Sequence, residues 1–158
     1  TLGMPYVEID VPRGTANRIA DFYEEILDGL ADVHEDGGGE YARIMVGPDQ
    51  HLVYRETDRP IEPFDNAHVQ ITLVDFSGPH ERLLAKGLVT EESDQHQYRF
   101  ENVVDLETGE VLATMEHEVR SMRHPLYARP LVNRNPAQTN MRFAPGHETW
   151  AWAMPDSD

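Results

Sequence analysis

The spacing of apolar positions changes in a fixed order along the chain. Residues 6–11 alternate between apolar and polar side chains, which predicts a half-buried strand. From Thr15 to Asp28 the apolar residues recur every three or four positions, which predicts an amphipathic helix with Thr15 as its N-cap. The apolar face of this helix would comprise Ile19, Phe22, Tyr23, Ile26 and Leu30. The opening stretch is therefore predicted to fold as a strand followed by a helix.

Three further strands are predicted before residue 58. The three consecutive glycines at 37–39 are typical of a turn, and Gly47-Pro48-Asp49-Gln50 is typical of a hairpin connection. The apolar, β-branched and aromatic runs between these turns predict strands at 31–36, 41–46 and 51–56. Residues 57–66 are polar and contain two prolines, so they are interpreted as a linker.

The same order of elements returns about 60 residues later. A strand is predicted at 68–75, a helix at 79–86 with Leu83 and Leu84 on its buried face, and strands at 89–93, 98–104 and 110–119. A near-constant offset between matching elements indicates an internal repeat. We therefore expect an α+β domain over residues 1–123, built of two βαβββ modules at about 4–58 and 67–120. Their curved mixed sheet would surround a pocket.

The last 35 residues do not continue the repeat. Residues 124–158 hold five of the eleven prolines and have no clear apolar period. They also contain too many apolar and aromatic residues for a plain disordered tail. We expect an extended arm that packs over the domain or over a partner subunit, with Trp150 and Trp152 docked as well.

Composition narrows the classes of function and partner. A formal net charge of −16 argues against nucleic acid or an anionic membrane as a partner, because both require a basic surface. The absence of cysteine excludes disulfides and thiol nucleophiles. No apolar run is long enough to span a membrane, and no basic region followed by an apolar region appears at the start, so we expect no secretory signal. These features lead us to expect a cytoplasmic protein.

The repeated module, with Phe22-Tyr23 followed by Leu27 and Gly29, resembles the vicinal oxygen chelate superfamily over about residues 4 to 120. Ala67-His68-Val69, which opens the second copy, carries the same resemblance. The superfamily includes glyoxalase I, extradiol dioxygenases, fosfomycin-resistance enzymes and bleomycin-binding proteins. The resemblance implies a homodimer with a pocket for a small molecule.

The resemblance also implies candidate metal ligands. Glu8 and His68 match the ligand positions in the first strand of each copy, and the ion would be Fe, Mn, Ni or Zn. Counting from the hairpin turns, the other two positions fall on Tyr54 and Ala113, where the family usually has glutamate. Strand parity puts His117, rather than its neighbours Glu116 and Glu118, on the face of Ala113, unless a bulge reverses it.

Roles other than metal binding are also open for these residues. Glu56 lies two residues after Tyr54 and is the candidate catalytic base. Tyr54, His117 and Arg120 are candidate binding residues, although Arg120 would equally pair with the neighbouring acids. His68 would equally be satisfied by backbone at a strand end. Asn133-Arg134-Asn135 would either hold an anion over the pocket or pack between subunits.

Two classes of function remain open from the sequence. The first is a metal-dependent lyase, isomerase or dioxygenase that chelates two neighbouring substrate oxygens. The second is a non-catalytic small-molecule-binding protein of the bleomycin-resistance type, without metal. An assembly role rests on the C-terminal arm alone. The sequence therefore leaves open whether the protein is an enzyme.

Overall fold

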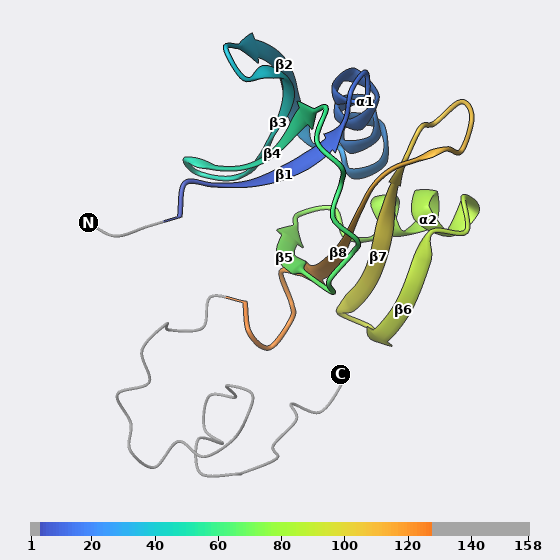
Figure 1. The fold of residues 1–158 in the computed structure, drawn as a ribbon. Coiled ribbons are helices and arrows are strands. Elements are labelled where there is room, and N and C mark those ends of the chain that lie inside the picture. The colour runs from blue at the N-terminus through green and yellow to red at the C-terminus, as the bar shows by residue number, and fades with distance from the viewer. Residues whose placement is uncertain (1–3, 128–158) are drawn as a thin grey trace.

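The computed structural model describes residues 4–127 of the 158-residue chain, and these residues form two consecutive βαβββ modules (Figure 1). The first module consists of β1 (Tyr6–Pro12), α1 (Ala16–Leu27), β2 (Leu30–Asp36), β3 (Gly39–Gly47) and β4 (Gln50–Thr57). The second consists of β5 (His68–Leu73), α2 (Ser77–Ala85), β6 (Val89–Asp94), β7 (Gln97–Val104) and β8 (Val111–Ser121).

Each module forms its own four-stranded mixed sheet. The first sheet has the order β1-β4-β3-β2 and the second sheet the matching order β5-β8-β7-β6. In both sheets the first and last strands of the module run parallel, and the other pairs are antiparallel. The predicted α+β class and the repeat of two βαβββ modules are therefore confirmed.

The helix α1 packs against both sheets. Its Tyr23 contacts Tyr54 of β4 and His117 of β8, with ring centroids 5.7 and 5.8 Å apart. Its Phe22 lies against Phe100 of β7, at 6.0 Å between centroids. The apolar side chains of the two modules consequently form one core cluster, with α1 at its centre. Burial of this surface is the main force that holds the modules together.

Because both sheets turn one side toward α1, the opposite sides face away from the core. We call the side of the first sheet that bears Glu8 and Arg55 the first open face. We call the side of the second sheet that bears His68 and Glu116 the second open face. Successive side chains of a strand alternate between the two sides, so open-face residues are spaced by two along each strand. The open faces carry most of the polar side chains of both sheets.

The second helix differs from the sequence prediction in two respects. It begins at Ser77 rather than at Pro79, because the Asp75 carboxylate accepts hydrogen bonds from the backbone N–H of Ser77 and Gly78 at 3.2 and 3.1 Å. Leu83 is fully buried as predicted, but Leu84 is 49% exposed, which corrects its assignment to the buried face. Only a narrow stripe of this short helix reaches the core.

The expected C-terminal arm lies outside the described residues, apart from its first four positions. Neither helix in the described part of the chain is long and apolar enough to cross a membrane.

Candidate functional site

A cavity of about 570 Å³ lies where the two modules meet. We call it the inter-module cavity. Its walls come from β1, from the linker residues 61–67 and from the first half of β8, residues 111–115. Val7, Ile9 and Met115 contribute apolar surface, and Phe64 of the linker contributes an aromatic ring. This volume lies within the range of small-molecule sites, which often form at such boundaries.

The polar wall of the inter-module cavity is acidic. Four carboxylates line it, from Glu8, Asp10, Glu62 and Asp65, and its described lining includes no lysine, arginine or histidine. Arg55 and Arg59, outside the lining, pair with Glu8 and Asp10, whereas no basic side chain of residues 4–127 pairs with Glu62 or Asp65. In a partly enclosed site, carboxylates without a paired cation create a negative potential that favours a cationic guest. The inter-module cavity is therefore both apolar and negatively charged.

An arginine outside the cavity fixes the position of Glu8. The Arg55 guanidinium donates to the Glu8 carboxylate at 3.1 Å and to both oxygens of Asp36 at 2.8 and 3.1 Å. It also stacks on Tyr41, 4.5 Å from the ring centroid. These contacts hold the pKa of Arg55 above its usual value, chiefly through Asp36, and keep that of Asp36 below its usual value. Glu8 is thus held as one member of a charge network on the first open face.

Glu8 also borders a second, smaller hollow. This cavity, of about 430 Å³, lies over the first open face and is lined by Tyr6, Tyr41, His51 and both Arg43 and Arg55. Its two arginines are already engaged, because Arg43 binds the Asp32 carboxylate through two nitrogens at 3.0 and 2.7 Å. The arginines here are therefore paired with carboxylates, whereas Glu62 and Asp65 of the inter-module cavity have no basic partner within residues 4–127.

His68 lies on the second open face, directly beside a carboxylate. It is the Cα partner of Glu116 in the parallel ladder of β5 and β8, so the two side chains project from the same face. Glu116 in turn accepts a hydrogen bond from Arg99 at 2.6 Å. Arg120 lies on this face too, where it pairs with Glu118 and donates to Gln97 at 3.0 Å. The Arg120 guanidinium, a candidate binding residue, is thus paired with two side chains of the protein itself.

A β-bulge in β8 decides which residue stands beside His68. The ladder pairs Phe100 with His117 and Asn102 with Thr114, so two steps along β7 correspond to three along β8. The extra residue reverses the parity, and Glu116 rather than His117 lies on the second open face. The partner of Glu8 in β4 is Val53 rather than Tyr54, so the count from the first hairpin turn is one residue too long.

Tyr54 and His117, both expected to line a binding pocket, lie on the helix side of their sheets and carry no exposed surface. His117 Nδ1 lies 2.7 Å from the Met115 carbonyl, which only accepts, so Nδ1 carries the proton. Nε2 then accepts from the Tyr23 hydroxyl at 2.5 Å, and the Tyr23 oxygen accepts from Tyr54 at 2.5 Å. Burial lowers the pKa of His117 to about 4 and raises those of both tyrosines. This buried chain joins the modules, and neither Tyr54 nor His117 lines the inter-module cavity or the smaller hollow beside Glu8.

Glu56, the expected catalytic base, also faces the helix. It is 4% exposed, and its Oε1 accepts a hydrogen bond from the backbone N–H of Ala16 at 2.9 Å. Thr15 occupies the N-cap position as predicted, but its hydroxyl donates to the Pro12 carbonyl instead of capping the helix. Glu56 therefore satisfies the first turn of α1 and lies on the opposite side of β4 from Arg55.

Metal-ligating side chains are not clustered in the part of the chain that the structure describes. Within residues 4–127, no group of three or more histidine, aspartate or glutamate side chains is arranged to hold an ion. Glu8 and His68 stand on the open faces of two different sheets, and neither belongs to such a group among the described residues. His68 and Glu116 are a neighbouring imidazole and carboxylate, which would supply two of the ligands that a divalent ion requires.

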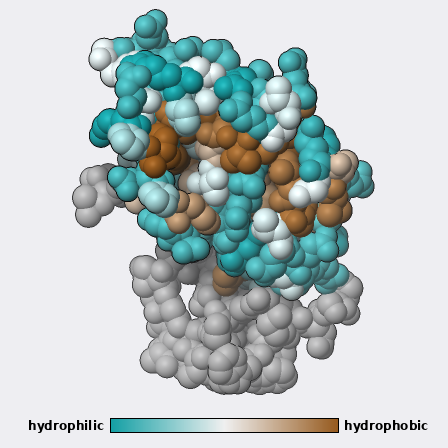
Figure 2. Space-filling model, turned by 45° about the vertical axis from the view of Figure 1, so that its right-hand side comes forward, coloured by the Kyte–Doolittle hydropathy of each residue, from teal (hydrophilic) through white to brown (hydrophobic). Residues whose placement is uncertain are grey.

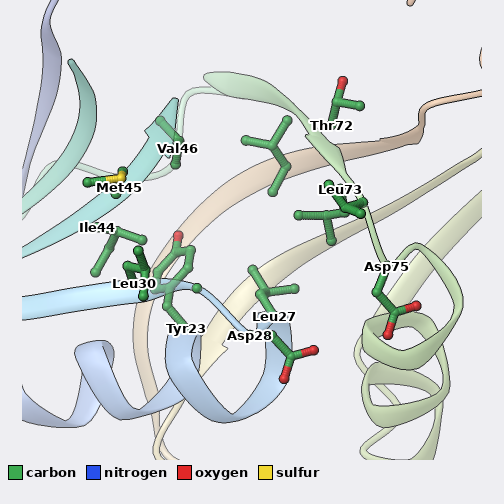
Figure 3. Close-up of a pocket in the computed structure, with 13 residues that line it drawn as sticks. Tyr23, Leu27, Asp28, Leu30, Ile44, Met45, Val46, Thr72, Leu73 and Asp75 are labelled. Carbon is green, nitrogen blue, oxygen red and sulfur yellow. The ribbon is translucent and has the colours of Figure 1, made fainter. Parts of the chain in front are cut away.

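A third depression is apolar. We call it the apolar groove. It has a volume of about 430 Å³ and lies between the end of α1, the end of β3 and the end of β5 (Figure 3). In the close-up, Tyr23 and Leu27 rise from α1 between Met45 and Val46 on one side and Leu73 on the other. No charged side chain other than Asp28 and Asp75 lines it among the described residues.

The residues that sequence reasoning missed are mostly in the linker. Glu62, Phe64 and Asp65 belong to a stretch interpreted only as a connection, and Asp10 was assigned no role. The available signal was the aromatic Phe64 among acids, in a segment too polar to enter the core. Only the meeting of β1 with the first half of β8 turns these residues into the wall of a cavity.

Comparisons of the whole sequence with families and with characterised proteins found no counterpart. No protein-family model matches the chain. No curated protein matches it either.

Solved structures with the same fold are numerous, and three of them are informative. A glyoxylase/bleomycin resistance protein/dioxygenase domain from a Frankia species is 18% identical, with 82% of this chain and 99% of that chain aligned at a TM-score of 0.51. An antibiotic-binding protein from a Streptomyces species is 14% identical, with 77% of this chain and 96% of that chain aligned at a TM-score of 0.53. A fosfomycin resistance protein from Listeria monocytogenes is 13% identical, with 77% of this chain and 91% of that chain aligned at a TM-score of 0.53.

Identities this low establish shared architecture and leave the chemistry open. The aligned share of each neighbour exceeds nine-tenths, so the similarity spans both modules. The chain therefore has the fold of the glyoxalase, bleomycin-resistance and fosfomycin-resistance proteins, which confirms the fold that the sequence resemblance implied.

Proposed function

We propose that the protein binds a small, flat organic cation in the inter-module cavity and that no metal takes part in this binding. The observation that carries the proposal is the lining itself, in which the ring of Phe64 occurs together with two carboxylates, Glu62 and Asp65, that pair with no basic side chain among the described residues. Carboxylates attract a cation, and an aromatic ring stabilises it through its negative face. The apolar wall would receive the hydrocarbon part of the same ligand.

Charge and size support this class of ligand over an anionic one. The chain carries a formal net charge of −16, so its long-range field repels anions and concentrates cations at the cavity mouth. A cavity of about 570 Å³ accommodates a molecule of a few fused rings. The name of the Streptomyces neighbour states that it binds an antibiotic, which is consistent with a small-molecule site on this fold.

Fluorescence titration with two matched dyes tests the proposal. Proflavine is a flat aromatic cation at neutral pH, and acridine is the uncharged parent ring system. The proposal predicts saturable one-to-one binding of proflavine to chelator-treated protein, and weaker binding of acridine. Equal affinity for the two dyes would contradict the charge argument, and absence of binding to the protein would contradict the proposal.

Substitutions in the cavity wall locate the binding. Glu62→Gln should weaken proflavine about threefold to fivefold and leave acridine unchanged, because only the cation loses an attractive charge. Phe64→Ala should weaken both dyes, because both lose an aromatic contact. Glu25→Gln, on the exposed side of α1, changes the net charge equally and should have no comparable effect. Equal loss in Glu25→Gln and Glu62→Gln would assign the attraction to net charge alone.

A second candidate function is favoured by the register of His68 and Glu116. An imidazole and a carboxylate side by side are two ligands of a divalent-metal site, and Glu8 of a second copy would supply a third. In this account the protein is a homodimer, and the ion would polarise a substrate oxygen. The hydrogen bond from Arg99 holds the Glu116 carboxylate in position beside His68.

Metal analysis separates the two candidates. If the binding proposal holds, protein purified without chelator carries no stoichiometric Fe, Mn, Ni or Zn, and Glu8→Ala and His68→Ala do not change that result. Stoichiometric metal that is lost in Glu8→Ala, His68→Ala and Glu116→Ala but kept in Glu25→Ala would establish the metal site. It would also remove the claim that the function is independent of metal.

A further inference from the structure

The apolar groove exposes more hydrophobic surface than the folded core requires. Leu30 and Val74 on its walls are 68% and 90% exposed, and Met45 is 49% exposed. Figure 2 shows that hydrophobic atoms gather into patches on the face it displays instead of being scattered singly. Contiguous exposed apolar surface beside a groove is typical of a binding surface.

One wall of the apolar groove is an open strand edge. β5 pairs with β8 on one side only, and within residues 4–127 no strand pairs with its other side. The groove is lined by the end of β5, Ile71–Leu73, whose side chains alternate between the two faces of the sheet, and by Val74 and Asp75, which follow the strand. Because side chains from both faces of the sheet line it, the groove runs along the edge of the strand. Unpaired backbone groups at such an edge accept an added extended segment.

The chain itself contains a segment with matching chemistry. Trp150-Ala151-Trp152-Ala153-Met154 alternates large apolar residues with alanine, so in an extended conformation its large side chains project to one side. Both tryptophans of the protein are in this segment. Large aromatic side chains bury roughly 200 Å² each when they dock. No charge within the segment opposes its entry into an apolar groove.

We propose that residues 150–154 add as a strand to the open edge of β5 of the same chain and insert Trp150, Trp152 and Met154 into the apolar groove. Trp150 lies 23 positions after Tyr127, and an extended chain of that length spans roughly 75 Å. A domain of this size has a radius of gyration of only about 14 Å, so the segment reaches every part of its surface. Tethering at an effective concentration near the millimolar range favours its own chain over a second copy.

Tryptophan fluorescence of the full chain reports on this segment alone. The proposal predicts a blue-shifted emission maximum and weak quenching by acrylamide, both independent of protein concentration. Val74→Asp should shift the emission to the red and raise the quenching constant severalfold. Val74 is 90% exposed in the described structure, so the substitution leaves the core intact. Leu84→Asp, which changes another exposed apolar residue outside the groove, is the matched control.

Three results would overturn the proposal. The first is emission typical of solvated tryptophan in the unsubstituted protein. The second is an identical change of emission and quenching in Val74→Asp and Leu84→Asp, which would show that the tryptophans do not lie in the groove. The third is a spectrum that changes on dilution together with the elution volume, which would assign the groove to a second copy. The dye titration of the inter-module cavity is a separate readout, so failure of either proposal leaves the other standing.

Discussion

At the scale of single residues, the buried chain of Tyr54, Tyr23 and His117 shows how polar groups can tie two modules together. Each member comes from a different element, and every hydrogen bond in the chain has a defined donor. The imidazole also stacks on Phe100, with centroids 4.2 Å apart and planes 9° from parallel. A fully satisfied buried network contributes to stability, whereas loss of one member leaves the others unpaired.

Acid should weaken the fold through His117. The pKa of His117 is about 4 in the folded protein, against an ordinary value of 6.5. The unfolded chain therefore binds the proton first as pH falls, and stability declines from pH 6.5 until the folded form is also protonated near pH 4. Over that interval the free energy of unfolding should drop by about 3 kcal/mol. Urea denaturation at a series of pH values measures this loss.

The variant His117→Phe isolates the titrating group. It keeps a ring against Phe100 but cannot bind a proton, so its free energy of unfolding should be lower at neutral pH and flatter over the interval in which His117 titrates. Equal slopes in both proteins over that interval would assign the acid sensitivity to other groups. A flat profile in the unsubstituted protein would contradict the buried, neutral state of His117.

At the scale of elements, the ends of the helices depend on carboxylates that are distant in sequence or lie just outside the helix. The Glu56 carboxylate of β4 accepts a hydrogen bond from a backbone N–H in the first turn of α1. The Asp75 carboxylate does the same for the first turn of α2. The α1 contact ties the helix to the strand that also pairs with β1. The buried Glu56 therefore stabilises the junction of three elements of the first module.

Removing the cap should cost stability in a graded way. Glu56→Gln keeps an oxygen that can accept from Ala16 but removes the charge that favours the helix N-terminus, so we expect a loss of about 0.5–1 kcal/mol. Glu56→Ala also removes the acceptor and should cost about 1–2 kcal/mol. Urea denaturation measures both values. Glu25→Ala, exposed on the same helix, should change stability by less than about 0.5 kcal/mol; an equal effect in all three variants would contradict the capping role.

Element positions were predictable from the sequence because apolar spacing and turn residues are local signals. The residue that faces a particular side of β8 was not, because a single bulge reverses the alternation. Parity alone favours His117 on the open face, whereas the bulge puts Glu116 there and sends His117 into the core. The same limit applied to Tyr54, where a count from the turn missed the face by one residue. A one-residue shift exchanges the two faces of a strand completely.

At the scale of the whole molecule, the site depends on how the modules pack. α1 packs against both sheets, so the first and second open faces, which bear Glu8 and His68, point away from the core. The repeat in the sequence predicts two modules but contains no information on which faces meet. The linker residues Phe64 and Glu62 line the inter-module cavity only because β1 lies beside the first half of β8.

The central claim is that ligand binds in the inter-module cavity, and amide chemical-shift mapping tests it most directly. Metal-free proflavine solution is titrated into isotope-labelled, chelator-treated protein, and the amide signals that move are assigned. The account predicts that the largest shifts fall on residues of β1, on linker residues 61–67 and on residues 111–115. Largest shifts around His68 and Glu116, or along the apolar groove, would contradict it, as would a spectrum that proflavine leaves unchanged.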